Sequence, residues 1–114
     1  LLPSIYMLGV LYMEGEGVFK NYDKAFEQFM RAAKRGDARA QYMVGAIYAE
    51  GFIDPEDEPD YAKAFLWSGL ALLGGVKQAQ SLKIAASVYL EKEQEARIVE
   101  QAAQCLQTNF ELCD

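Results

Sequence analysis

Histidine is absent from the sequence, and cysteine occurs only twice among its 114 residues. Histidine is the commonest general base and the commonest transition-metal ligand. Its absence therefore argues against a general-base catalytic site and against a transition-metal site. Cys105 and Cys113 are too far apart for a metal knuckle and have no other ligands nearby. Ser68, Ser81 and Ser87 lack a histidine and a convincing lysine partner. The composition therefore predicts a protein that is not an enzyme, with no catalytic residue, no metal and no cofactor.

The chain also lacks long apolar runs and basic clusters. Its most hydrophobic stretch, from Phe65 to Val76, is interrupted by a serine and three glycines and is shorter than the roughly 18 residues of a membrane span. Lys34 and Arg35 form the only adjacent basic pair, and the net charge is −6. Nucleic-acid binding needs a clustered basic face, so we expect none. The first residues, 1–3, include no initiator Met, so we expect a fragment or a processed product.

A repeated pattern organises what is present. The segment Leu8–Gly15 aligns with Val44–Gly51 as apolar-Gly-x-apolar-Tyr-x-Glu-Gly, which gives an offset of 36 residues from Gly9 to Gly45. The segment Tyr22–Phe26 matches Tyr61–Phe65 at four of five positions, an offset of 39 residues. The three extra residues fall in one place, between Gly51 and Tyr61. An insertion confined to one loop is typical of helical repeats, so the chain is predicted to be a repeat protein.

Each repeat unit is predicted to form two helices, because apolar residues recur at helical spacing between loop signals. We expect helices at about 3–14, 22–35, 38–50 and 60–73, and a third pair at about 77–90 and 93–107. Asp60 is the expected N-cap of the fourth helix, and Gly51 the left-handed residue that ends the third. The last helix is expected to end the stack with a polar outer face. Its expected inward-facing residues are Ala96, Val99, Ala102, Ala103 and Leu106.

Gly9 and Gly45 stand in the middle of predicted helices, where glycine costs about 1 kcal/mol relative to alanine. The physical explanation is close helix–helix contact, because a residue without a Cβ lets one helix approach its partner. Large side chains are then expected to fill the space around each glycine. Packing of small residues against large ones at a fixed period is typical of a solenoid.

These residues resemble the Sel-one-like repeat family, a relative of the tetratricopeptide repeats. Repeat one follows the family pattern from Ser4 to Gly36, and repeat two follows it from Ala40 to Gly75. A tetratricopeptide assignment is the alternative, but its period of about 34 residues is shorter than the 36 found between Gly9 and Gly45. The matching residues proposed as structural are Gly9, Tyr12, Gly15, Ala25, Gly36, Gly45, Tyr48, Gly51, Ala64 and Gly75.

The resemblance implies an all-α fold, a right-handed α/α superhelix of about two full helix-pair repeats plus a C-terminal capping helix pair. The whole chain, 1–114, is expected to be a single domain. Within it we expect repeat one at about 3–36, repeat two at about 37–75, a degenerate third repeat and cap at about 76–107, and a tail at 108–114.

The resemblance further implies a non-catalytic adaptor that binds a peptide or protein on the concave face of the first helices. The alternative is a structural capping or self-association segment of a larger scaffold. A weaker alternative is cell-wall glycan or β-lactam binding, which a cysteine-rich branch of the family suggests. That branch has a disulfide in every repeat, and this chain lacks those cysteines.

Candidate partner-binding residues lie beside the packing stripe of the first helices. Tyr6 and Met7 recur as Tyr42 and Met43, and large adaptable side chains of this kind suit a protein-binding surface. The competing interpretation is that they pad the contact between successive repeats. The full candidate set is Tyr6, Met7, Val10, Met13, Tyr42, Met43 and Ala46.

The segment 54–60 is rich in carboxylates, which are ligands for calcium. It has no EF-hand spacing, and Pro55 and Pro59 restrict how it could wrap around a cation. A solvated insert in a loop is therefore the preferred interpretation.

Cys105 and Cys113 resemble the closing cysteine pair of exported bacterial members of the family. A disulfide between them would hold the tail against the last helix, and it would imply a periplasmic or extracellular location. The alternative is one buried and one free thiol in a cytoplasmic protein.

Overall fold

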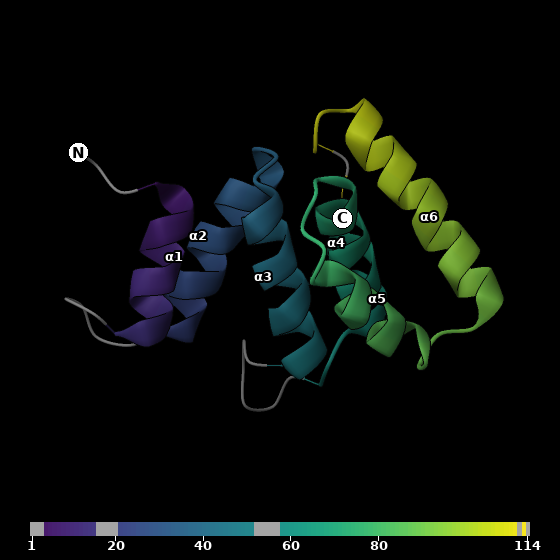
Figure 1. Cartoon of the computed structure of the whole chain (residues 1–114), viewed down its shortest axis with the longest axis horizontal. Helices are drawn as coiled ribbons and strands as arrows, with labels where there is room; N and C mark the ends of the chain where they lie inside the picture. Colours follow the sequence, from purple (N-terminus) through teal and green to yellow (C-terminus); the bar gives the residue numbers. More distant parts are fainter. Residues whose placement is uncertain (1–3, 16–20, 52–57, 112, 114) are drawn as a thin grey trace.

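Six helices make up the fold that a computed structural model describes for residues 4–15, 21–51, 58–111 and 113. They follow one another along a body of 44 × 31 × 23 Å, with α1 and α6 at opposite ends of its longest axis (Figure 1). The helices are α1 (Ile5–Glu14), α2 (Tyr22–Lys34), α3 (Ala38–Glu50), α4 (Tyr61–Leu73), α5 (Ala79–Ser87) and α6 (Lys92–Gln107). Each of the first five helices packs mainly on the helices next to it in the sequence, α1 on α2, α2 on α3, α3 on α4 and α4 on α5. This is the predicted all-α solenoid.

Helix ends follow local signals in the sequence. Asp60 caps α4 by accepting a hydrogen bond from the backbone N–H of Lys63 at 3.0 Å, as predicted. Gly51 ends α3 in the left-handed conformation, with φ of 73°. The helix expected at 77–90 is shorter, because residues 88–90 continue in tight turns. The first helix begins at Ile5, and the expected start at Pro3 lies outside the described residues.

The two repeats share contacts as well as sequence. In each, the backbone N–H of the residue before the second helix donates to the carbonyl of the repeated tyrosine, Asn21 to Tyr12 at 2.8 Å and Asp60 to Tyr48 at 2.9 Å. The lysine of the second helix then lies over the ring of the same tyrosine. Lys24 Nζ is 5.7 Å from the ring centroid of Tyr12, and its counterpart Lys63 is 5.3 Å from that of Tyr48.

The mid-helix glycines lie at close helix–helix contacts. A Cβ on Gly9 would come within 2.7 Å of the ring of Phe29 on α2. A Cβ on Gly45 would meet backbone atoms of α4, at 3.2 Å from the nitrogen of Ser68 and 3.3 Å from the carbonyl oxygen of Ala64. The large residue beside Gly9 is an aromatic ring, whereas the neighbour of Gly45 is the helix backbone itself.

The buried core follows the repeat, with its largest side chains on α2 and α4. Phe29 and Trp67 are fully buried, and Ala25 and Ala64 fill the matching small positions. The buried hydroxyl of Ser68 keeps a hydrogen-bond partner, because it donates to the carbonyl of Ala64 at 2.6 Å.

The prediction of which α6 side chains face inward is wrong for four of the five residues, which are exposed. Val99 is 57% exposed and Leu106 44% exposed, and Ala96 and Ala103 are exposed too. Ile98 and Cys105 are buried instead, and Ala102 packs beside them. The reason is tertiary: α6 lies over α4 and hardly contacts α5, so the side that would have met α5 remains open (Figure 1).

The tail returns onto the body after α6. Its reversal uses left-handed backbone at Asn109 and Phe110, where φ is 56° and 68°. The sulfur atoms of Cys105 and Cys113 are bonded in the structure, with their Cα atoms 4.5 Å apart and both side chains buried. The bond ties the tail to the last turn of α6.

Candidate functional site

A surface hollow of about 360 Å³ brings three of the candidate residues together. Tyr6 comes from α1, Tyr42 and Met43 come from α3, and the turn between α4 and α5 closes the other side. We call it the first-helix hollow. Its lining residues are Tyr6, Arg39, Tyr42, Met43, Gly75, Val76 and Gln78.

Packing holds the aromatic and cationic groups of this hollow in place. The ring of Tyr6 lies 5.6 Å from that of Phe29, which anchors it on the core. The guanidinium carbon of Arg39 lies 4.3 Å from the centroid of the Tyr6 ring, within cation–π range. The same guanidinium pairs with the carboxylate of Asp37 at 3.3 Å. The hydrogen bond and charge of Asp37 raise the pKa of Arg39.

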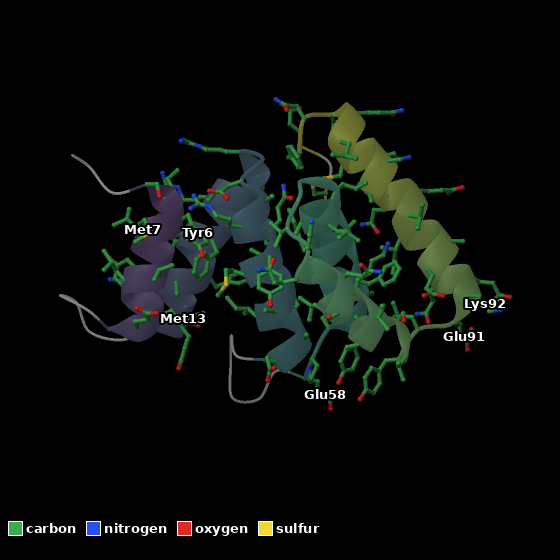
Figure 2. All side chains as sticks on the ribbon, viewed as in Figure 1. Tyr6, Met7, Met13, Glu58, Glu91 and Lys92 are labelled. Atoms are coloured by element: carbon green, nitrogen blue, oxygen red, sulfur yellow. A yellow bond between two sulfur atoms is a disulfide. The ribbon has the colours of Figure 1, made fainter. Side chains whose placement is uncertain are left out.

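The remaining candidates do not line the hollow. Met7 is 42% exposed and lies on the outer side of α1, whereas Tyr6 points toward α3 (Figure 2). Val10 and Met13 pack against the buried core, and Ala46 is half-buried. Tyr6 and Met43 pack against the same core as Val10 and Met13, as the interpretation of padding between successive repeats expects.

Sequence reasoning missed four of the lining residues. Arg39 precedes Tyr42 and Met43 by three and four positions, so helical spacing would have placed it on their face. Gly75, Val76 and Gln78 belong to a turn more than thirty positions away from Tyr42, and the packing of α4 on α3 brings that turn here.

A second hollow, of about 320 Å³, follows the open side of α6. We call it the C-terminal groove. Among the described residues that line it, Lys83 is the only charged one, and the Lys83 ammonium lies 5.3 Å from the ring centroid of Phe65. The groove is lined by Phe65, Leu66, Gly69, Leu72, Leu73, Lys83, Ile98, Val99, Ala102, Ala103 and Leu106.

Two of the three serines considered as catalytic candidates are hydrogen-bonded within their own helices. The hydroxyls of Ser68 and Ser87 donate to backbone carbonyls of their own helices, at 2.6 Å in each case. Within the described ranges, no group of three or more acidic or cysteine side chains could hold a metal ion. Of the acidic segment, positions 54–57 lie outside the described residues, and Asp60 is engaged as a helix cap. No helix in the described part of the chain is both long and apolar enough to cross a membrane.

The repeated sequence is matched by a family model. The Sel1 repeat model matches the sequence twice, at residues 2–37 and 38–76, which together make up more than half of the chain. The chain belongs to the Sel1 repeat family. The two matches join at the turn between α2 and α3, close to the repeat boundaries expected from the sequence.

Solved Sel1-type structures share this fold. One is a protective antigen of uropathogenic Escherichia coli strains that displays an SLR fold, with a TM-score of 0.74 and 26% identity over 95% of this chain. Another is a Sel1 repeat protein from Oxalobacter formigenes, with a TM-score of 0.65 and 28% identity over 89% of this chain. This chain spans only 22% and 42% of those two proteins. No curated protein matches the sequence.

Proposed function

We propose that this Sel1 repeat protein is a non-catalytic adaptor that binds a peptide segment of another protein in the first-helix hollow. The observation that carries the proposal is the convergence of Tyr6, Arg39 and Tyr42 from two repeats on one open surface. Tyrosine and arginine are enriched among the residues that dominate protein–protein binding energies. Met43 adds an adaptable apolar contact beside them.

The chemistry of the hollow indicates what kind of segment would fit. Tyr42 is half-buried and is not packed against the core, so its ring is available to a partner. Arg39 offers a cation that is 60% exposed, with one carboxylate already beside it. A segment that presents an apolar or aromatic side chain next to a carboxylate would satisfy both groups.

The cysteine pair supports an exported location for the adaptor. Disulfides persist in oxidising compartments and are rare in the cytosol. Cys105 and Cys113 are bonded and buried in the structure. We therefore propose that the chain acts in the periplasm or outside the cell.

Site-specific crosslinking at Tyr42 tests the binding face. A photoreactive phenylalanine analogue at position 42, introduced in the native host, is expected to crosslink one dominant partner, which mass spectrometry identifies. The matched control places the same analogue at Tyr89, which is 63% exposed and lies in the turn after α5.

The purified partner then allows a quantitative test. Tyr42→Ala is expected to weaken its binding about tenfold or more, as loss of a central contact does. Tyr89→Ala is expected to bind as the unaltered protein does. If Tyr42→Ala retains full affinity while its helical content is unchanged, the first-helix hollow is not the binding face.

A further inference from the structure

The middle of α4 contains a glycine that helix packing does not explain. Gly69 stands inside a helix, as Gly9 and Gly45 do, and glycine disfavours the helical conformation relative to alanine. An added Cβ would meet an atom of a neighbouring helix at 2.7 Å on Gly9 and at 3.2 Å on Gly45, whereas on Gly69 the nearest atom is Lys83 Cε at 3.8 Å. At Gly69 the helix therefore loses stability without gaining a closer contact between helices.

The missing side chain leaves space in the wall of the C-terminal groove. Gly69 lines this groove from α4, and Ala102 and Ala103 line it from α6. A large side chain at position 69 would project toward Lys83 and fill part of the volume of about 320 Å³. Small-molecule sites have volumes of about 300–1,000 Å³. The groove is therefore large enough for a slender ligand.

Lys83 brings one positive charge to this groove. Its side chain is half-buried, its ammonium lies over the ring of Phe65, and it forms no ion pair with any residue that the structure describes. Glu95 lines an adjoining hollow together with Lys83, but the two side chains are not paired. A charge-assisted hydrogen bond is stronger than a neutral one, and the ammonium is available to make one. The groove therefore favours a ligand that carries an anionic group next to an apolar body.

The other described residues of the groove have no polar side chains. An extended peptide in the groove would lose water from its backbone N–H and C=O groups and find no partners for them. A helix is about 10 Å across, which is too wide to enter between α4 and α6, because these two helices pack directly on each other. An alkyl chain has no polar groups to satisfy and gains from burial against apolar side chains.

We propose that the C-terminal groove binds a fatty acid, with its alkyl chain along α4 and α6 and its carboxylate at the ammonium of Lys83. The eight positions from Phe65 to Leu73 extend about 12 Å along α4, which suits a chain of medium length. The groove shares no residue with the first-helix hollow, so the proposal goes beyond the adaptor role and either can fail without the other.

Equilibrium dialysis tests the site on the purified full chain. Radiolabelled decanoate and dodecanoate, each below its micelle-forming concentration, give the dissociation constant and the number of molecules bound. We expect one molecule per chain, and binding about tenfold tighter for dodecanoate because it buries two more CH₂ groups. Dodecanol has the same chain without the carboxylate, and it is expected to bind about tenfold more weakly than dodecanoate.

Two variants separate the role of the space from that of the charge. Gly69→Leu fills the groove and is expected to abolish binding, although urea unfolding should show a chain at least as stable, because leucine favours a helix more than glycine does. Lys83→Met removes the charge and is expected to weaken dodecanoate about tenfold and leave dodecanol unchanged. Lys63→Met is the matched control and should bind normally, because Lys63 also lies 5.3 Å from a ring centroid but stands outside the groove.

Three results would overturn the proposal. The first is an unaltered chain that does not bind dodecanoate, and the second is a Gly69→Leu chain that binds it with full affinity. The third is a Lys83→Met chain with unchanged affinity for dodecanoate, which would mean that the carboxylate is not bound at Lys83. A photoreactive phenylalanine analogue at Val99 tests the competing occupant. A chain that ignores dodecanoate and crosslinks a protein at this position would have a protein-docking groove instead.

Discussion

Replacing Gly9 with alanine tests whether close contact between α1 and α2 sets the geometry of the first repeat. The added Cβ would lie 2.7 Å from two ring atoms of Phe29 and 3.0 Å from a third. Phe29 is fully buried and Tyr6 packs against it, so the ring has little room to withdraw. Overpacking of a core costs about 1–3 kcal/mol, while alanine favours a helix interior by about 1 kcal/mol. Because three contacts are too short, we expect a net loss of about 1–2 kcal/mol.

Gly69→Ala provides the opposite case within the same fold. Gly69 is also in the middle of a helix, but the nearest atom to an added Cβ is Lys83 Cε at 3.8 Å, an ordinary contact. The helix preference of alanine is then unopposed, and Gly69→Ala is expected to stabilise the protein by about 0.5–1 kcal/mol.

Urea unfolding measures both variants. Trp67 is the single tryptophan and is fully buried, so its fluorescence reports loss of the core alongside circular dichroism. Phe29→Leu made in the Gly9→Ala background is expected to recover part of the lost stability, as a double-mutant cycle would show. Gly9→Ala as stable as the unaltered protein would refute the explanation of the mid-helix glycine.

Two further expectations follow from the tail and from a pair of stacked rings. Cys113→Ser is expected to lower the free energy of unfolding by about 2–3 kcal/mol, which is the loop-closure contribution of a disulfide between residues this close in sequence. Mass spectrometry checks the bond itself, because the unaltered chain should weigh two hydrogen atoms less before reduction than after it. The Tyr61 ring stacks on Tyr89 at 3.9 Å, and burial, followed by the neighbouring Tyr89 phenol, raises the pKa of Tyr61 above its ordinary value. Its proton is therefore held more tightly in the folded state, so this stabilisation is present below about pH 10 and declines as pH rises further. The Tyr61 part of the tyrosinate absorbance, obtained as the difference from Tyr61→Phe, is expected to appear at lower pH in Tyr89→Phe than in the unaltered chain, because the phenol of Tyr89 is removed while its ring remains. Equal titrations would contradict the effect of Tyr89.

The order of helices and their ends could be predicted from the sequence, because both depend on local interactions. Asp60 caps α4 with its own side chain. Gly51 ends α3 because glycine adopts the left-handed backbone conformation without a steric penalty. The repeat offset between Gly9 and Gly45 likewise predicted the pairing of helices. Repetition is visible in one sequence, since each unit solves the same packing problem with the same residues.

The C-terminal end could not be predicted in the same way, because α6 has no repeat counterpart to fix its rotation. Val99 and Leu106 follow helical spacing as well as Ile98 and Cys105 do, so periodicity alone offers two apolar faces. Packing on α4 and the bond from Cys105 to Cys113 accompany burial of the second face.

The candidate site could also be predicted only in part. Tyr6, Tyr42 and Met43 were found from the sequence because they recur at the repeat offset. The turn at Gly75 and Val76 joins them only through the stacking of separate helices. The repeat unit, its caps and the residues that recur within it were readable without coordinates, since these depend on neighbours a few positions away. Which side of α6 is buried, and which turn closes the first-helix hollow, became visible in the packed helices, since both depend on contacts between residues far apart in the sequence.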